Sequence, residues 1–122
     1  MLNQAQVKKE AQYNMGLILL QQGNYQKAAS YLQNTPNIYL AYAQLMAGDN
    51  GAAFNTFKKL KLTNATEYYL MAVAAARVKD VNAMTMALQK AIEMNPKLRQ
   101  QAATDAEFQP YANNAVYRQL MK

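Results

Sequence analysis

The chain contains no cysteine and no histidine among its 122 residues. Without cysteine, disulfides and thiol chemistry are excluded, and cysteine usage says nothing about the redox compartment. Without either residue, the commonest general base, the commonest metal ligand and the strongest nucleophile are all missing. We therefore expect no metal, no cofactor and no small-molecule substrate.

Acidic residues are also scarce, with 7 Asp and Glu against 13 Lys and Arg, so that the formal net charge is +6. The carboxylates are scattered, and most fall at expected helix starts or turns, where they favour the helix dipole. The segment "GDNG" at 48–51 lacks the lysine and the preceding strand of a phosphate-binding loop, and it does not match a calcium loop. We therefore expect that the protein is not an enzyme.

Long apolar runs are missing too. The longest, "YYLMAVAAA" at 68–76, is well short of the roughly 20 residues that span a bilayer. The amino terminus, "MLNQAQVKKE", becomes polar at once and lacks the apolar core of a signal peptide. We expect one soluble domain over residues 1–122, cytoplasmic, or periplasmic if an upstream signal has been removed. It is either a complete protein or a fragment of a longer one.

Hydrophobic spacing indicates helices throughout. The first helix is expected over about residues 4–22, with one apolar face formed by Val7, Ala11, Met15, Ile18 and Leu19. Gly23 supplies the left-handed turn that ends this helix, and Asn24 is expected to cap the next one through its side chain. No segment alternates polar and apolar residues for long enough to form a strand.

The same punctuation recurs along the chain. Thr35 and Pro36 are expected to be the N-cap and first residue of a third helix. Asn64 with Glu67 resembles a capping box before a fifth helix. The hairpins predicted from these breaks cover residues 4–34, 35–62 and 64–95.

Three units in register resemble the tetratricopeptide repeat. The third unit matches that pattern best, through Tyr68, Met71, Ala72, Leu88, Ala91 and Pro96. The first unit offers "YNMG" at 13–16 and Ala28, and the second Leu40, Ala41, Ala53 and Phe57. The resemblance implies an all-α, right-handed array of about three helical hairpins, an α-solenoid.

Small residues recur where two helices of such a hairpin must approach closely. These predicted contact positions are Gly16, Ala28, Ala41, Ala53 and Ala72. The last segment, 96–122, keeps apolar residues around Pro110, and we expect it to cap the open face of the final repeat. It is similar to the tails that follow such repeats in some bacterial proteins.

The resemblance implies a protein-interaction scaffold in which the first helix of each hairpin lines a concave groove. By position, the groove residues are Tyr13, Leu17, Leu20, Ile38, Tyr42, Leu45, Tyr69, Val73 and Arg77. A groove lined by tyrosines suits a peptide, since tyrosine offers a large apolar area and a hydroxyl at little entropic cost. The alternative is that these side chains are simply core.

Two further alternatives stay open. The basic residues Lys58–Lys61, with Arg77 and Lys79, could form a nucleic-acid-binding surface, although such a run at the end of a helix is more often a solvated face that complements the helix dipole. Leu17 and Leu20 lie off the apolar face of the first helix. Either the groove is apolar there, or another repeat or a second copy in a homodimer packs against it.

Overall fold

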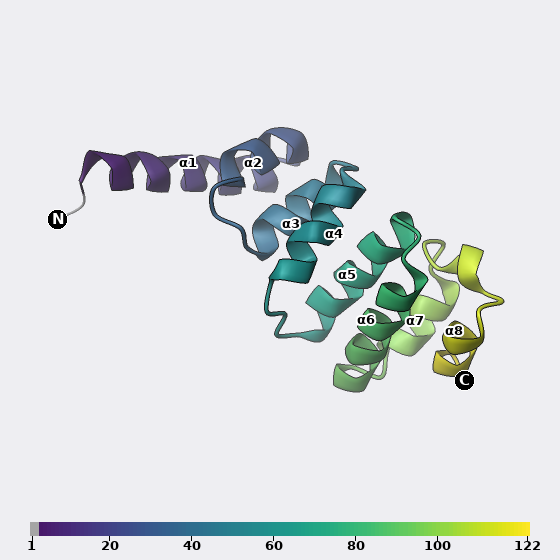
Figure 1. Ribbon diagram of the computed structural model, residues 1–122. Helices are drawn as coiled ribbons and strands as arrows, with labels where there is room; N and C mark the ends of the chain where they lie inside the picture. Colours follow the sequence, from purple (N-terminus) through teal and green to yellow (C-terminus); the bar gives the residue numbers. More distant parts are fainter. Residues whose placement is uncertain (1–2) are drawn as a thin grey trace. The chain divides into compact units, whose positions relative to one another are not determined.

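The computed structural model describes residues 3–122, and every regular element within that range is helical. The predicted all-α class is therefore confirmed (Figure 1). The chain divides into two compact units, Met1–Leu60 and Lys61–Lys122.

The first unit contains two helical pairs. Helix α1 (Gln4–Gln21) packs against α2 (Tyr25–Leu32), and α3 (Ile38–Met46) packs against α4 (Asn50–Lys59). Helix α2 also contacts α3. The amino-terminal half of α1 extends past α2 (Figure 1), and residues 4–11 are exposed.

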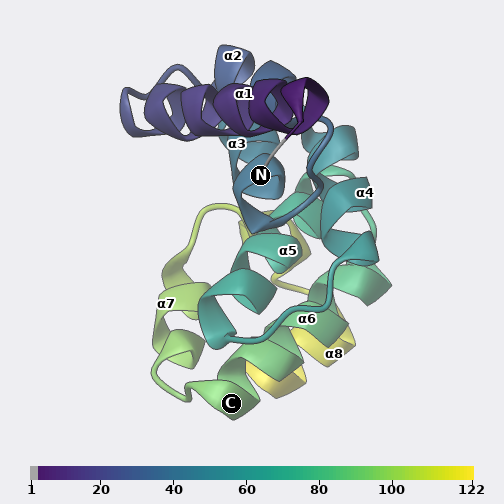
Figure 2. The same ribbon diagram turned by 90° about the vertical axis from the view of Figure 1, so that its left-hand side faces the viewer.

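The second unit is a hairpin covered by short helices. Helix α5 (Ala65–Arg77) pairs with α6 (Val81–Met94). Then follow α7 (Leu98–Thr104), a 3₁₀ turn η1 (Gln109–Tyr111) and α8 (Ala115–Leu120). Both α7 and α8 contact α6 (Figure 2), and Phe108 between them in the sequence is fully buried.

All three helical pairs are joined by the same turn. Gly23 and Gly48 have φ angles of +78° and +85°, in the left-handed region, and Lys79 takes the same conformation with φ +65°. In each turn the next residue donates its N–H to a carbonyl five residues earlier, as in the Schellman motif. The three donors are Asn24, Asp49 and Asp80, each at 2.9 Å from its acceptor oxygen.

The predicted small contact positions are confirmed. The four alanines among them, Ala28, Ala41, Ala53 and Ala72, are fully buried. Gly16 is buried against Leu32, and a Cβ atom at Gly16 would lie only 2.7 Å from Leu32 Cδ2.

One predicted cap is half right and one predicted helix start is wrong. Asn24 is the N-cap residue of α2, as predicted, but its side chain makes no capping bond. The third helix starts after Asn37, not at Thr35 and Pro36. The side-chain oxygen of Asn37 accepts bonds from the N–H groups of Tyr39 and Leu40 at 3.0 and 3.2 Å, so Asn37 is the better cap.

The capping box is only half present. Asn64 accepts from the N–H of Glu67 at 2.9 Å, as predicted. The Glu67 carboxylate, however, accepts from the N–H of Thr63 at 2.9 Å, one residue earlier than the pattern requires.

The predicted inner face of the first helix is wrong for most of its residues, although Leu19 does pack against the core. Val7, Met15 and Ile18 are 52%, 43% and 47% exposed. The opposite side of α1 packs against the core, because Gly16 on that side allows α2 to approach. Since the segment "MGLILL" at 15–20 is apolar nearly all round, spacing alone could not identify the buried face.

Candidate functional site

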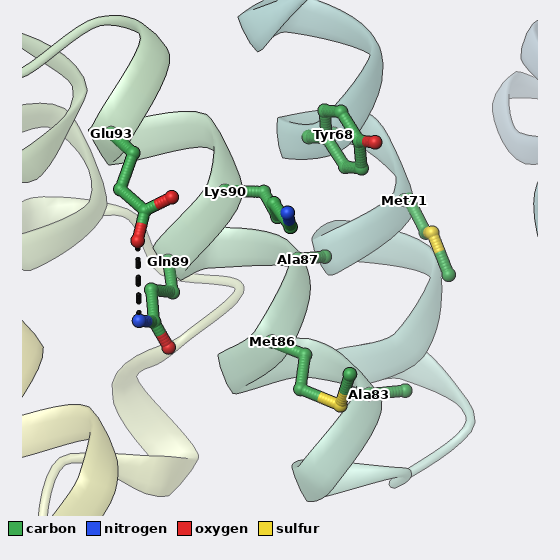
Figure 3. Close-up of a pocket in the computed structure, with 8 residues that line it drawn as sticks. All are labelled: Tyr68, Met71, Ala83, Met86, Ala87, Gln89, Lys90 and Glu93. Carbon is green, nitrogen blue, oxygen red and sulfur yellow. Dashed lines mark hydrogen bonds between the residues drawn. The ribbon is translucent and has the colours of Figure 1, made fainter. Parts of the chain in front are cut away.

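A groove of about 370 Å³ lies between α5 and α6 in the second unit (Figure 3). Its volume is at the lower end of the range of about 300–1,000 Å³ that is usual for ligand pockets. Two residues come from α5 and the others from α6. They are Tyr68, Met71, Ala83, Met86, Ala87, Gln89, Lys90 and Glu93.

Helical spacing explains the hollow. Tyr68 and Met71 are three residues apart on α5, and Ala83, Ala87 and Lys90 follow one another on a face of α6. The alanines leave room between the longer side chains of the two helices. The caps Asn64 and Asp80 fix where these helices start, and thus which residues face each other.

Met86 is the most unusual residue of the groove. It is 69% exposed, although a methionine normally prefers the interior. Its neighbours Met84 and Leu88 on α6 are fully buried, so the fold of the hairpin does not depend on Met86. Unbranched and polarisable, methionine adapts its shape to different apolar partners.

At the polar end of the groove, the carboxylate of Glu93 has a hydrogen-bond partner and the ammonium of Lys90 has none among the described residues. Gln89 donates a hydrogen bond from Nε2 to Oε1 of Glu93 at 3.2 Å. Lys90 extends from α6 toward α5 (Figure 3) and has no hydrogen-bond or ion-pair partner within residues 3–122. The groove thus combines an apolar floor with one cation that the described part of the chain does not neutralise.

The predicted groove residues of α1 face the interior of the first unit. Tyr13, Leu17 and Leu20 are partly buried against a core of Ala28, Leu32, Leu40 and Ala43. The Tyr13 hydroxyl also accepts a hydrogen bond from Nδ2 of Asn37 at 3.1 Å.

The predicted groove residues of α3 lie at different depths. Leu45 is buried, whereas Ile38 and Tyr42 are half-buried. The Tyr42 ring meets the Tyr25 ring edge to face, with centroids 6.1 Å apart. Burial raises the pKa of Tyr42, and the neighbouring Tyr25 raises it further.

The predicted groove residues of α5 are largely internal. Tyr69 and Val73 are buried. The Tyr69 hydroxyl donates to Oδ2 of Asp105 at 2.6 Å, and the ring meets Phe108 edge to face at 5.6 Å. Burial raises the pKa of Tyr69, and the bond to Asp105 adds to this shift. The hydrogen bond and the ring contact together hold the carboxy-terminal segment against α5.

Arg77 is committed to an ion pair. Its guanidinium donates to the Glu107 carboxylate through both Nε and Nη2, with the shortest distance at 2.6 Å. These bonds raise the pKa of Arg77. Among the other cations of the proposed basic surface, the Lys58 ammonium lies 4.7 Å above the Phe54 ring centroid.

The sequence analysis did not predict Met71, Met86 or Lys90 as groove residues. The buried stripe of α6, which contains Met84, Leu88 and Ile92, dominates its hydrophobic pattern. A second stripe with i, i+3, i+4 and i+7 spacing, Ala83, Met86, Ala87 and Lys90, was the available signal.

Comparison of the chain with protein-family models, with curated proteins and with solved structures gives no match. Within residues 3–122 no cluster of three or more acidic side chains is placed to hold a metal ion. None of the helices in that range combines the length and apolar character needed to cross a bilayer.

Proposed function

We propose that the protein is a non-catalytic interaction module that binds an apolar segment of another protein. The observation that carries this proposal is the open α5–α6 groove with its exposed Met86. A large apolar side chain that stays in water contributes nothing to the free energy of folding. The same side chain contributes to the free energy of binding when a partner covers it.

The proposal includes a tetratricopeptide-like, right-handed arrangement of the hairpins. Three helical pairs joined by the same turn support it, as do the buried small residues at the repeat positions. A repeated supersecondary unit of this kind typically offers an extended surface to protein partners.

The acidic side chains of the second unit support a non-catalytic role. Asp80 caps α6 by accepting from the N–H of Ala83 at 3.1 Å. Asp105 holds Tyr69, and Glu107 holds Arg77. Each of these carboxylates has a structural task, so none needs a catalytic one to explain its position.

Nucleic-acid binding is the alternative function, through Lys58–Lys61, Arg77 and Lys79. The ion pair of Arg77 with Glu107 weighs against it, because this cation is already neutralised. Electrophoretic shift assays with single- and double-stranded oligonucleotides distinguish the two functions. Salt-sensitive micromolar binding would favour the nucleic-acid alternative.

Selection from a displayed library of random peptides tests the proposed function. We expect enriched peptides with large apolar side chains that bind the wild-type protein but bind Met86→Gln weakly. Met94→Gln is the matched control, because Met94 lies on the same helix, is 53% exposed and does not line the groove. The absence of enrichment, or equal binding to both variants, would contradict the proposal.

A further inference from the structure

We infer that the α5–α6 groove receives an amphipathic helix whose polar edge is acidic, and that Lys90 contacts a carboxylate of that helix. This inference rests on the proposed function and adds the chemistry of the partner. Its basis is the shape of the groove together with the charge distribution of the second unit.

The shape favours a helix. The groove is walled by two helices, and its apolar floor follows their side-chain ridges, so a third helix can place its own apolar ridge between them. Within residues 3–122 there is no strand whose edge an extended peptide could join. Met71 and Met86 can adapt to the side chains that enter.

The charges favour an acidic partner. Basic residues outnumber acidic ones in Lys61–Lys122, and every carboxylate of this unit accepts a hydrogen bond from within it. The acceptors are Glu67, Asp80, Glu93, Asp105 and Glu107. Of these, Glu107 forms an ion pair with Arg77, and Asp105 interacts electrostatically with the same arginine. The lysines of the unit therefore leave a positive field available to an incoming anion.

Lys90 and Glu93 give the groove a positive and a negative position. They lie about one helical turn apart on α6, and the Glu93 carboxylate is turned toward Gln89 (Figure 3). A carboxylate of the partner is therefore favoured beside Lys90 and disfavoured beside Glu93. A second copy of this chain is a poorer occupant, because two chains of net charge +6 repel each other.

Three synthetic peptides labelled with a fluorophore test the inference. The first carries leucines at i, i+3, i+4 and i+7 with glutamates beside them, the second replaces the glutamates with lysines, and the third disperses the leucines of the first. Binding is followed by fluorescence anisotropy at about 0.01 M and about 0.15 M salt, which span strong and weak screening lengths. We expect the acidic amphipathic peptide to bind most tightly, and more so at low salt.

Two variants locate the effect. Lys90→Gln is expected to weaken binding of the acidic peptide roughly two- to five-fold, the range of an exposed charge pair, and Glu93→Gln to strengthen it. Lys97→Gln, which removes an exposed charge outside the groove, is the matched control and should leave selectivity for the acidic peptide unchanged.

The outcomes separate the inference from the proposed function. Equal binding of acidic and basic peptides overturns the inference and leaves the proposed function standing. If the designed helices do not bind but library-selected peptides do, the occupant is not a helix and the inference is again wrong. If neither class binds, both fall. Self-association that Met86→Gln abolishes would overturn the inference in favour of a second copy.

Discussion

The hydroxyl of Tyr69 donates a hydrogen bond of 2.6 Å to the carboxylate of Asp105, which is 36 residues further along the chain. This bond joins α5 to the segment that follows α7. The ring of Phe108 packs on Tyr69 from that segment, and the Tyr111 hydroxyl donates to the carbonyl of Ala76 at 2.7 Å. The carboxy-terminal segment is thus fastened to the α5–α6 hairpin by specific polar contacts as well as by burial.

Tyr69→Phe should lower the free energy of unfolding by about 1.5–3 kcal/mol, because it removes a partly buried hydrogen bond to a charged group. Tyr68→Phe is the control, since Tyr68 lines the open groove and has no hydrogen-bond partner within residues 3–122. Urea denaturation measures both. Equal midpoints for the two variants would mean that the Tyr69–Asp105 bond contributes no net stability.

Stability should fall above about pH 10. In the unfolded chain Tyr69 ionises near its ordinary pKa of 10.0, whereas burial and Asp105 raise the pKa of the folded state. Above pH 10 the unfolded state therefore binds fewer protons, and the free energy of unfolding decreases. Denaturation at pH 8 and about pH 11 should show a smaller loss for Tyr69→Phe than for wild type. An identical loss would assign the alkaline sensitivity to other groups.

Gly16→Ala should destabilise the first unit, because the new methyl group would lie 2.7 Å from Leu32 Cδ2 in a filled core. Overpacking of this kind costs about 1–3 kcal/mol. Gly51→Ala is the control: it also changes a helical glycine, and no atom beyond its chain neighbours and its own helix backbone lies within 4 Å of the new Cβ. There, the lower backbone entropy of alanine in the unfolded chain should add about 0.4–1 kcal/mol of stability. Thermal unfolding of both variants checks the opposite signs.

Part of the fold could be predicted from the sequence. Some positions can be recognised from the residue type alone. A left-handed turn favours glycine, as at Gly23 and Gly48, and a close contact between two helices favours alanine. The buried face of α1 could not be predicted, because it depends on which side α2 approaches. The site is harder still. From their positions in the repeat, Tyr69 and Arg77 are predicted to face the groove. Their side chains instead bind Asp105 and Glu107, which lie about 30 or more residues further along the chain.

Tyr25 and Tyr42 should be energetically coupled. Their rings meet edge to face at 6.1 Å, an arrangement that contributes about 0.5–1.5 kcal/mol beyond the area it buries. Tyr25→Ala, Tyr42→Ala and the double variant complete a double-mutant cycle in urea. Strictly additive losses would show that the two rings only share a surface.

The central claim is that the α5–α6 groove is the contact surface, and isotope-labelled methionine methyl groups test it most directly. Met71 and Met86 line the groove, while Met46 lies on α3 beside the sequence-predicted groove residues Tyr42 and Leu45. On titration with a library-selected peptide, the account predicts resonance shifts at Met71 and Met86 and none at Met46. Shifts at Met46 with unchanged Met71 and Met86 would contradict it and place the contact on α3.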